Sequence, residues 1–414
     1  MTSRSAFLRV PVLAACAAAA AVLMLPGPVQ GADAVASTER ISVAPDGTGG
    51  NYHSSNPAVS ADGRVVAFQS AASNLVPGPV VQPDVYYRTA PGSPLGRIHV
   101  EGESTSSPQV SANGRYLTFG SYSRTTTKSS VHVMDLRTQR TERLAPALAK
   151  NWEVSYGRAP VSADGRYVAF VARPTVDEDG DGVLPCRIYV LDRTTGQADR
   201  VSKPDDSSKR FHDCYGMSMS ADGRKVAYFD GWSNGSDSDG DQGDIVVHDR
   251  STGRDVQADA THDGGPADLS SVQPVISADG SKVAFDSRAN NLVPGEDPNR
   301  DWNAFVRDLR TGALQRIDGR APTDVTLAED LSMNGTKMVV NTADANHTTL
   351  GLQLRDLRTG RDTLLAPGVD GKPVTIAAAT LSLDGSTVAF YSYHPGLVPD
   401  DNNLIGDVFL RHLR

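Results

Sequence analysis

The sequence predicts an all-β protein, a seven-bladed β-propeller of four-stranded antiparallel blades whose ring is closed by its own N-terminal strand. A four-residue signature recurs seven times, a similar series of strands follows each copy, and the last copy lacks one strand. The composition agrees, because 38 glycines and 25 prolines in 414 residues supply the turns that many short strands need. We find no convincing helix after the N-terminus.

The first 34 residues are predicted to be a secretory signal peptide, which leaves residues 35–414 for the propeller. Arg4 and Arg9 form a positive n-region, and an apolar run from Val10 to Leu25 follows them. Cleavage after Gly31 and cleavage after Ala34 both fit the pattern. We therefore expect a secreted, extracytoplasmic protein.

A lipid anchor at the cell surface is the alternative location. The segment Leu13-Ala14-Ala15-Cys16 is similar to a bacterial lipobox, in which the cysteine becomes the lipidated first residue. The apolar run continues beyond Cys16 where a lipoprotein has a polar tether, so ordinary secretion is favoured. No later stretch is apolar enough to span a bilayer.

The charge of the chain restricts its partners. The net charge is −9, and loss of the signal peptide makes it more negative because Arg4 and Arg9 leave with it. An acidic surface repels phosphate groups, which argues against nucleic acid and anionic membranes as partners. We expect a monomer that meets an extracytoplasmic protein, peptide or glycan.

The repeated signature is a serine, a small or apolar residue, an aspartate or asparagine, and a glycine. An apolar residue always precedes the serine, and successive serines lie 50 to 58 residues apart, which is the period of a four-stranded blade with long loops. The Asp-Gly or Asn-Gly step predicts a tight turn between the first two strands. The seven copies begin at Ser60, Ser111, Ser162, Ser220, Ser277, Ser332 and Ser382.

The ends of the chain predict how the ring closes. The seventh repeat stops after its third strand, at residues 407–411, so its fourth strand is missing. A segment of suitable character, residues 39–43, precedes the first repeat. Pairing the two would leave no open sheet edge at the junction.

These repeats resemble those of the TolB-like, or WD40-like (PD40), propellers. That family carries a Ser-Pro-Asp-Gly step before an apolar strand and an Asp-x-x-Thr-Gly turn before the last strand; residues 192–196 match the turn. The resemblance covers roughly residues 38–414 and departs from TolB itself, which has six blades behind a separate domain. It implies a binding scaffold, or the non-catalytic lid of a serine peptidase, and carries no catalytic residue to this chain.

The long loops opposite the signature turns are the expected functional face, and two of them are acidic. Residues 177–182 have aspartates at alternate positions and a glycine that permits a bend, as the start of a calcium loop does, and residues 237–244 form a looser copy. The alternative is a solvated acidic turn, because the position of a bidentate glutamate holds Ile188. Similar segments at 295–301 and 400–407 are consistent with turn chemistry alone. The predicted calcium ligands are Asp177, Asp179, Asp181, Asp237, Asp239 and Asp241.

Two cysteines remain after processing, Cys186 and Cys214, and both should lie on the loop face of neighbouring blades. Export permits their oxidation, so a disulfide is predicted. The alternatives are two buried free thiols, or a zinc site that would need His212 and a further ligand.

Two features point toward catalysis without requiring it. The segment Gly231-Trp232-Ser233-Asn234-Gly235 matches the nucleophile elbow of α/β-hydrolases, but no helix follows the serine. His53, His212 and His262 fall in links between blades and could perform acid–base work. We therefore expect a non-enzymatic binding protein that needs no cofactor and takes calcium as an optional ligand. The alternative is an extracytoplasmic hydrolase or lyase acting at the channel mouth.

Overall fold

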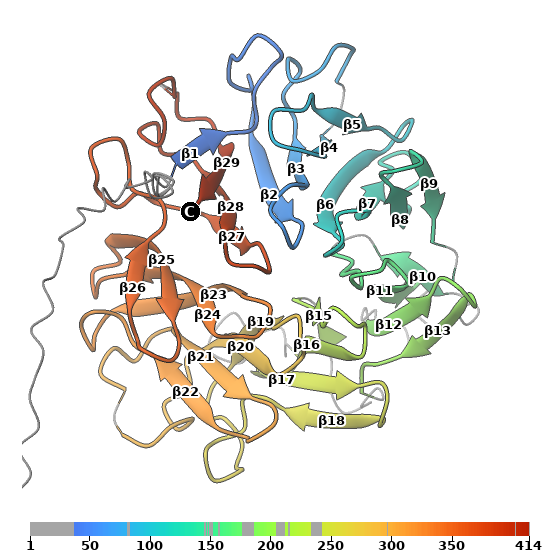
Figure 1. Ribbon diagram of the computed structural model, residues 1–414. Helices are drawn as coiled ribbons and strands as arrows, with labels where there is room; N and C mark the ends of the chain where they lie inside the picture. The colour runs from blue at the N-terminus through green and yellow to red at the C-terminus, as the bar shows by residue number, and fades with distance from the viewer. Residues whose placement is uncertain are drawn as a thin grey trace, which may run out of the picture. The chain divides into compact units, whose positions relative to one another are not determined.

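The computed structural model contains seven antiparallel sheets arranged around a common axis (Figure 1). All described strands belong to one unit, Ala36–Arg414, and the described residues contain no helix. The seven-bladed propeller predicted from the sequence is therefore confirmed. The structure describes residues 37–80, 83–144, 146, 148, 152–155, 158–175, 186–203, 212–213, 216–232, 242–295, 297–401 and 403–413.

Each blade has four strand positions, numbered outward from the axis, and consecutive strands pair as hairpins. Blade 4 divides its innermost position between two short strands, β14 and β15, which both pair with β16. The strands of blades 1 to 3 are β2 (Ser54–Val59), β3 (Val66–Ser70), β4 (Asp84–Arg88) and β5 (Gly96–Ile98); β6 (Ser104–Val110), β7 (Tyr116–Tyr122), β8 (Ser129–Asp135) and β9 (Arg140–Arg143); β10 (Trp152–Ser155), β11 (Tyr167–Pro174), β12 (Arg187–Asp192) and β13 (Gln197–Arg200). Those of blades 4 to 7 are β14 (His212–Asp213), β15 (Ser218–Met219), β16 (Lys225–Trp232), β17 (Gln242–Asp249) and β18 (Arg254–Gln257); β19 (Ser271–Ile276), β20 (Lys282–Ser287), β21 (Asn303–Asp308) and β22 (Leu314–Ile317); β23 (Val325–Leu331), β24 (Lys337–Ala343), β25 (Thr349–Asp356) and β26 (Asp362–Leu364); β27 (Ala378–Leu381), β28 (Thr387–Ser392), β29 (Asp407–His412) and β1 (Ser37–Arg40).

The N-terminal strand closes the ring, as predicted. β1 pairs antiparallel with β29, and Arg40 lies opposite Phe409. The strand ends at Arg40, slightly earlier than the sequence suggested, but the Ile41 backbone N–H still donates to the Val408 carbonyl at 2.9 Å. The Ser42 hydroxyl donates to buried Asp407 at 2.5 Å. The two ends of the chain therefore share one sheet, which removes an open edge.

The signature serines and aspartates hold the turns together. In blade 1 the Ser60 hydroxyl donates to the Asp62 carboxylate at 2.6 Å and accepts the Val65 backbone N–H at 3.0 Å. Gly63 adopts a φ of 71°, a left-handed conformation that glycine takes without steric cost. The same serine hydroxyl bonds recur in the other six blades, so the repeated motif is a structural device.

Backbone hydrogen bonds join these turns into a closed circle around the axis. Each turn bonds to the turn of the next blade, from Ala61 N–H donating to the Ala112 carbonyl at 3.1 Å round to Asp384 N–H donating to the Ala61 carbonyl at 3.1 Å. Seven such bonds link seven blades. They hold the signature-turn ends of the innermost strands close together, so we expect a substrate to enter from the opposite, loop face.

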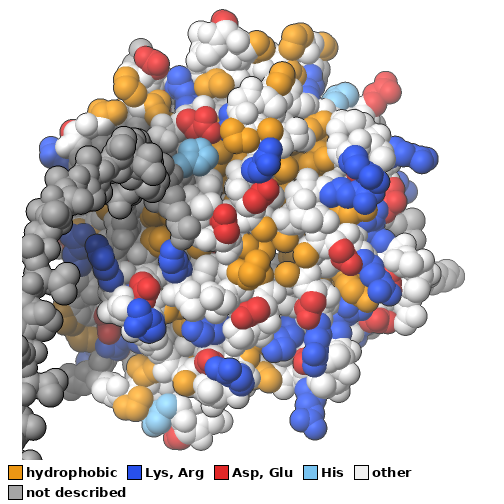
Figure 2. All heavy atoms as spheres, viewed as in Figure 1, with side chains coloured by type: hydrophobic (Ala, Val, Ile, Leu, Met, Phe, Trp, Pro, Cys, Tyr) orange, Lys and Arg blue, Asp and Glu red, His pale blue; other side chains and the backbone are white. Residues whose placement is uncertain are grey.

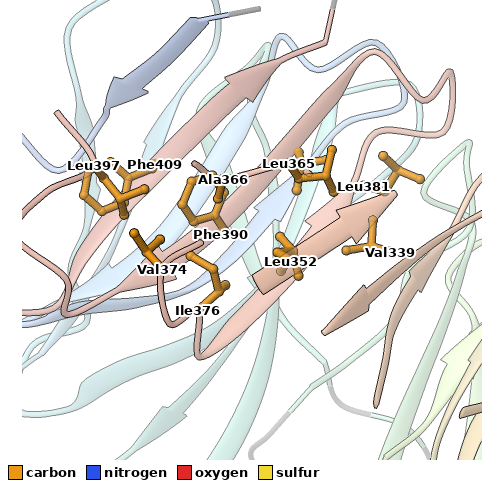
Figure 3. Packing of buried hydrophobic residues seen from close by; sticks show 12 residues of the cluster. Val339, Leu352, Leu365, Ala366, Val374, Ile376, Leu381, Phe390, Leu397 and Phe409 are labelled. Atoms are coloured by element: carbon orange, nitrogen blue, oxygen red, sulfur yellow. The ribbon is translucent and has the colours of Figure 1, made fainter. Parts of the chain in front are cut away.

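Hydrophobic cores lie between neighbouring blades, one at each junction. At the junction of blades 6 and 7, Val339 and Leu352 pack with Phe390 and Phe409 (Figure 3). In five blades, an aromatic residue of the second strand also stacks on the ring of the residue directly opposite it on the third strand. Phe285 and Phe305 are one such pair, with ring centroids 5.7 Å apart. The apolar residues that alternate along these strands thus form the core, which leaves the axis for other side chains.

Candidate active site in the central channel

All seven blades contribute residues of the innermost strand, or of the segment that follows it, to a cavity of about 170 Å³ on the axis. Most of the lining residues have apolar side chains, but polar atoms make up most of the surface that faces the cavity. Figure 2 shows one face of the ring, where hydrophobic side chains gather around the centre and charged ones surround them. Only three residues of the lining are ionisable: Arg158 from blade 3 and the adjacent Glu329 and Asp330 from blade 6.

A β-bulge places the two carboxyl groups in the channel. The pairing of β23 with β24 shifts between Ala328 and Asp330, so Glu329 is an extra residue without a register partner. A bulge of this kind re-aims side chains, and such irregularities are common beside active sites. Both side chains consequently line the cavity although they are neighbours in the sequence.

Glu329 is the titratable group with the most unusual environment in the channel. Its Oε2 atom accepts the Ala379 backbone N–H at 3.1 Å. Burial raises the pKa of Glu329 to about 7, although this hydrogen bond, Asn341 and the positive charge of Arg158 act in the opposite direction. A carboxyl with this pKa exchanges protons readily at neutral pH, which is the property of a general acid or base.

Asp330 is held in place by three donors. Its Oδ2 atom accepts the Leu381 backbone N–H at 2.8 Å and the Thr380 hydroxyl at 2.9 Å, while Oδ1 accepts the Leu331 backbone N–H at 2.8 Å. Burial raises the pKa of Asp330 in spite of these bonds. The residue joins blade 6 to blade 7, and we assign it the role of positioning the strand that carries Glu329.

A third buried carboxyl fixes the other side of the bulge. Asp286 of β20 accepts the Ala328 backbone N–H at 2.7 Å and is only 2% exposed. Burial holds the pKa of Asp286 well above its ordinary value, and the nearby charge of Glu329 adds to this. Blades 5 and 7 therefore both anchor the backbone around Glu329.

Arg158 supplies the positive charge of the channel. Its side chain is exposed to the channel, and it makes no hydrogen bond or ion pair with any described residue. Its charge nevertheless acts on both carboxyl groups of blade 6 and opposes the rise of each pKa. An arginine in this position is suited to bind an anionic group of a ligand, since its guanidinium offers paired donors to a carboxylate.

The structure does not bring the predicted histidines together. His53 lies between blades 1 and 7, where its Nδ1 accepts the Gly406 backbone N–H at 3.0 Å. His262 lies in the link between blades 4 and 5, where its backbone N–H donates to the Leu292 carbonyl. The side chain of His212 is outside the described part of the structure. Proton transfer by this set is therefore not supported, and Glu329 takes its place as the candidate.

The hydrolase-like motif is not confirmed as a nucleophile elbow. Gly231 and Trp232 end the long strand β16, and the rest of the motif, residues 233–235, lies outside the described residues.

Both acidic loops also lie outside the described residues, so their calcium site, at Asp177, Asp179, Asp181, Asp237, Asp239 and Asp241, stays a prediction. The pairing of Cys186 with Cys214 stays a prediction as well, since Cys186 is buried but Cys214 is not described. Within the described ranges, no group of three or more His, Cys, Asp or Glu side chains is arranged to hold a metal ion. Nor does any described helix have the length and apolar character needed to cross a membrane.

In two other acidic segments, aspartates form ion pairs with an arginine from a neighbouring strand. Arg40 of β1 lies 3.5 Å from Asp401 and 3.4 Å from Asp407, and Arg316 of β22 lies 3.7 Å from Asp297. These guanidinium groups balance the negative charge of the loops at 295–301 and 400–407. The interpretation of those loops as structural agrees with these contacts.

An alignment of the seven repeats would have revealed the site that the sequence reasoning missed. Three residues before each signature serine, the chain carries an uncharged residue in six blades and Glu329 in blade 6. At the next position, the residue is again uncharged in six blades and is Asp330 in blade 6. Four residues before the serine, the residue is charged only in blade 3, where it is Arg158. An ionisable residue at a position that is otherwise uncharged is therefore the available signal.

Fold and site together define a propeller with a candidate proton-transfer site in its channel. No family model matches the sequence, and no curated protein matches it. Solved structures do match: an oligogalacturonate lyase from Vibrio parahaemolyticus has a TM-score of 0.59 at 13% identity, over 92% of this chain and 97% of the lyase. The propeller domain of the Trilobed protease from Pyrococcus furiosus has a TM-score of 0.56 at 13% identity, over 89% of this chain and 95% of that domain. A puromycin-hydrolyzing peptidase from Mycobacterium tuberculosis has a TM-score of 0.54 at 16% identity, over 84% of this chain and 50% of the peptidase.

TolB from Acinetobacter baumannii also matches, at 13% identity over 76% of this chain and 80% of TolB, but its TM-score of 0.41 is too low to carry an argument. The propeller class is thus shown, whereas membership of the PD40 repeat family stays a prediction. Identities this low establish a shared fold and nothing finer.

The expectation of a non-enzymatic binding scaffold was wrong. The structures that match over most of this chain include enzymes, namely the lyase and peptidases. The physical reason for the error lies in the channel. The loops carry the candidate catalytic groups that are visible in the sequence, whereas the structure places three ionisable residues around the channel, at the inner edges of blades 3 and 6.

Proposed function

We propose that this protein is an extracytoplasmic enzyme, a lyase that cleaves a carboxylate-bearing substrate in its central channel. The observation that carries the proposal is Glu329, a carboxyl with a pKa of about 7 in a channel that also contains an arginine with no hydrogen-bond or ion-pair partner among the described residues. The matching folds include both lyases and peptidases, so the choice between reactions comes from the chemistry of the site.

Glu329 acts as the base in the proposed elimination. Its carboxylate removes a proton from the carbon next to the substrate carboxylate, a double bond forms to the neighbouring carbon, and the bond from that carbon to the leaving oxygen breaks. The protonated Glu329, or water, returns a proton to the leaving oxygen. A base whose pKa lies near neutral pH is suited to both transfers, because it gains and loses its proton at low cost.

Arg158 binds the carboxylate of the substrate. Pairing with the guanidinium withdraws electrons from the carboxylate, which makes the adjacent C–H bond more acidic and stabilises the negative charge that develops there.

A hydrolase is the second candidate, because Asp330 provides another carboxyl beside Glu329. Hydrolysis of a glycosidic bond by two carboxyl groups needs one as acid and the other as nucleophile or base. Asp330 already accepts three hydrogen bonds from blades 6 and 7, which leaves it poorly placed for that role. The lyase is therefore our first choice.

The test is a turnover assay of the purified mature protein with a uronic-acid oligosaccharide, a neutral oligosaccharide and a peptide anilide. Elimination from the acidic sugar creates a conjugated double bond, seen as ultraviolet absorbance, whereas hydrolysis gives a new reducing end or free aniline without it. We expect absorbance that is lost in Glu329→Gln and kept in Glu101→Gln, a matched change at an exposed glutamate away from the channel. Hydrolysis without the absorbance would establish the second candidate, and turnover unaffected by Glu329→Gln would overturn both.

A further inference from the structure

Four rings form a continuous row on the loop face where blades 1 and 7 meet. Tyr52 and His53 pack edge to face with centroids 5.1 Å apart, and His53 and Tyr393 do so at 5.5 Å. Tyr391 follows Tyr393 at 6.1 Å, also edge to face. β2 and β28, which carry or adjoin these residues, lie side by side in Figure 1.

The outer part of this row is exposed, which is unusual for rings that contact one another. Tyr52 is 57% exposed and Tyr393 is 49% exposed, and His53 between them is exposed as well. Single exposed aromatic residues need no explanation, but a contiguous group of them commonly marks a binding surface. Tyrosine suits this role because its ring is apolar while its hydroxyl forms hydrogen bonds.

The backbone of blade 7 fixes these rings in position. Gly406 donates its N–H to His53 Nδ1 at 3.0 Å, which leaves Nε2 as the protonated nitrogen of a neutral imidazole. Tyr393 packs closely against the same glycine, because a Cβ atom at Gly406 would approach its ring to 2.9 Å. The platform is thus prepared in advance of any ligand, which lowers the entropy cost of binding.

The inner end of the row lies on the strand next to the one that borders the channel. Tyr391 lies opposite Ala378 in the pairing of β27 with β28, and the next residue, Ala379, donates its N–H to Glu329. The pKa of the Tyr391 hydroxyl is raised by burial and by the charges of Tyr393 and Glu329, which places this hydroxyl within electrostatic range of both. A ligand that leaves the channel on this side would therefore meet Tyr393 and then Tyr52.

We propose that Tyr52, His53 and Tyr393 form a carbohydrate-binding subsite, which holds the part of a sugar chain that extends out of the channel. This inference rests on the proposed function, since it assigns the substrate class of that same site: a glycan with a carboxylate on the unit that meets Arg158. The C–H faces of sugar rings stack on the tyrosines, and the phenol hydroxyls and His53 Nε2 bond to sugar hydroxyls.

The size of the channel cavity supports this assignment. Its volume is about 170 Å³, whereas sites that enclose a larger ligand usually have about 300 Å³ or more. The channel accommodates one terminal unit, so the rest of a chain needs a surface outside it. The exposed rings supply flat contact areas, which suit sugar rings better than peptide side chains, for which pockets are required.

The test uses Glu329→Gln, which should bind substrate without consuming it. Binding of a uronic-acid oligosaccharide and of the corresponding monosaccharide is measured by calorimetry. In this background, Tyr52→Ala and Tyr393→Ala should each weaken oligosaccharide binding by about fivefold and leave monosaccharide binding unchanged. Val369→Ala, at another exposed apolar residue, is the control and should change neither.

Two outcomes would overturn the subsite: an oligosaccharide that binds no more tightly than the monosaccharide, or binding that is unaffected by either tyrosine change. Binding of a peptide library member in place of any sugar would also overturn it. Failure of the proposed function looks different, because oligosaccharide binding would then depend on the tyrosines while the wild-type protein showed no turnover.

Discussion

The innermost strands of blades 5 and 6 both contain a shift of register against the second strand, but they carry very different side chains. In both, the register against the second strand shifts, between Val272 and Val275 in β19 and between Ala328 and Asp330 in β23. Blade 5 places Pro274 and Val275 where blade 6 places Glu329 and Asp330. The bulge is thus a property of the fold, and the chemistry depends on which residues occupy it.

Carboxyl groups at these positions are costly to bury, which is why the comparison is informative. An ionised carboxylate that is buried at the channel loses hydration, and the protein compensates only in part through hydrogen bonds from blade 7 and the charge of Arg158. A proline or valine at the same place incurs no such cost. Sequences that depart from local stability in this way do so mainly at functional sites.

The largest effect should come from exchanging the residues that distinguish the two blades. Glu329→Gln should lower kcat by about 100-fold or more, which is the usual contribution of one acid–base group. Adding Pro274→Glu to this variant restores a carboxyl three residues before a signature serine, but in blade 5. Steady-state kinetics should show no recovery, because the Ala379 donor of blade 7 and the Asp286 anchor of blade 5 hold the bulge around residue 329 and not residue 274. Recovery would mean that a carboxyl at the equivalent position of another blade suffices.

A smaller loss is expected when the positioning carboxyl is altered. Asp330→Asn keeps the shape of the side chain but directs an amide N–H₂ group toward donors, the Thr380 hydroxyl or the Leu381 N–H. One donor then loses its acceptor, so the free energy of unfolding should fall by about 1 to 3 kcal/mol in urea titrations. Activity should decline together with a shift of the pH profile, since Glu329 moves. An unchanged pH profile would reduce Asp330 to a purely structural role.

The fold could be predicted from the sequence because its signals are local and repeated. The Asp-Gly and Asn-Gly turns, the alternating apolar strands and the incomplete seventh repeat each follow from short-range chemistry, and the structure has all three. The site was not predicted, because Arg158 and Glu329 are 171 residues apart and meet only when the ring closes. The bulge at Ala328 and Asp330 has no separate sequence signature either. The loops that seemed most informative include residues that the structure does not describe.

The next largest effect is a pH dependence of stability that comes from Glu329 of blade 6, because Pro274 at the same position of blade 5 does not titrate. The folded pKa of Glu329 is about 7, above its ordinary value of 4.5, so the folded state keeps a proton that the unfolded chain releases between these pH values. The free energy of unfolding therefore decreases as pH rises from about 4.5 to about 7. The group is half-buried, so we expect a loss of about 1 kcal/mol rather than the full shift. Denaturant titrations of Glu329→Gln should show a flatter dependence, and an identical slope would contradict the raised pKa.

The smallest effect should separate the signature serines of the same two blades. The Ser277 hydroxyl donates to the Asp279 carboxylate at 2.7 Å, whereas the Ser332 hydroxyl is 3.4 Å from the Asn334 amide oxygen. Each also accepts a backbone N–H at 3.0 Å, so that part of the loss is shared. Bonds to a charged acceptor are stronger, and Ser277→Ala should therefore cost about 0.5 kcal/mol more than Ser332→Ala in thermal or urea unfolding. Equal losses would mean that the accepted backbone bond dominates in both turns. In either case kcat should not change, because these hydroxyls hold the turns of the ring and do not line the channel.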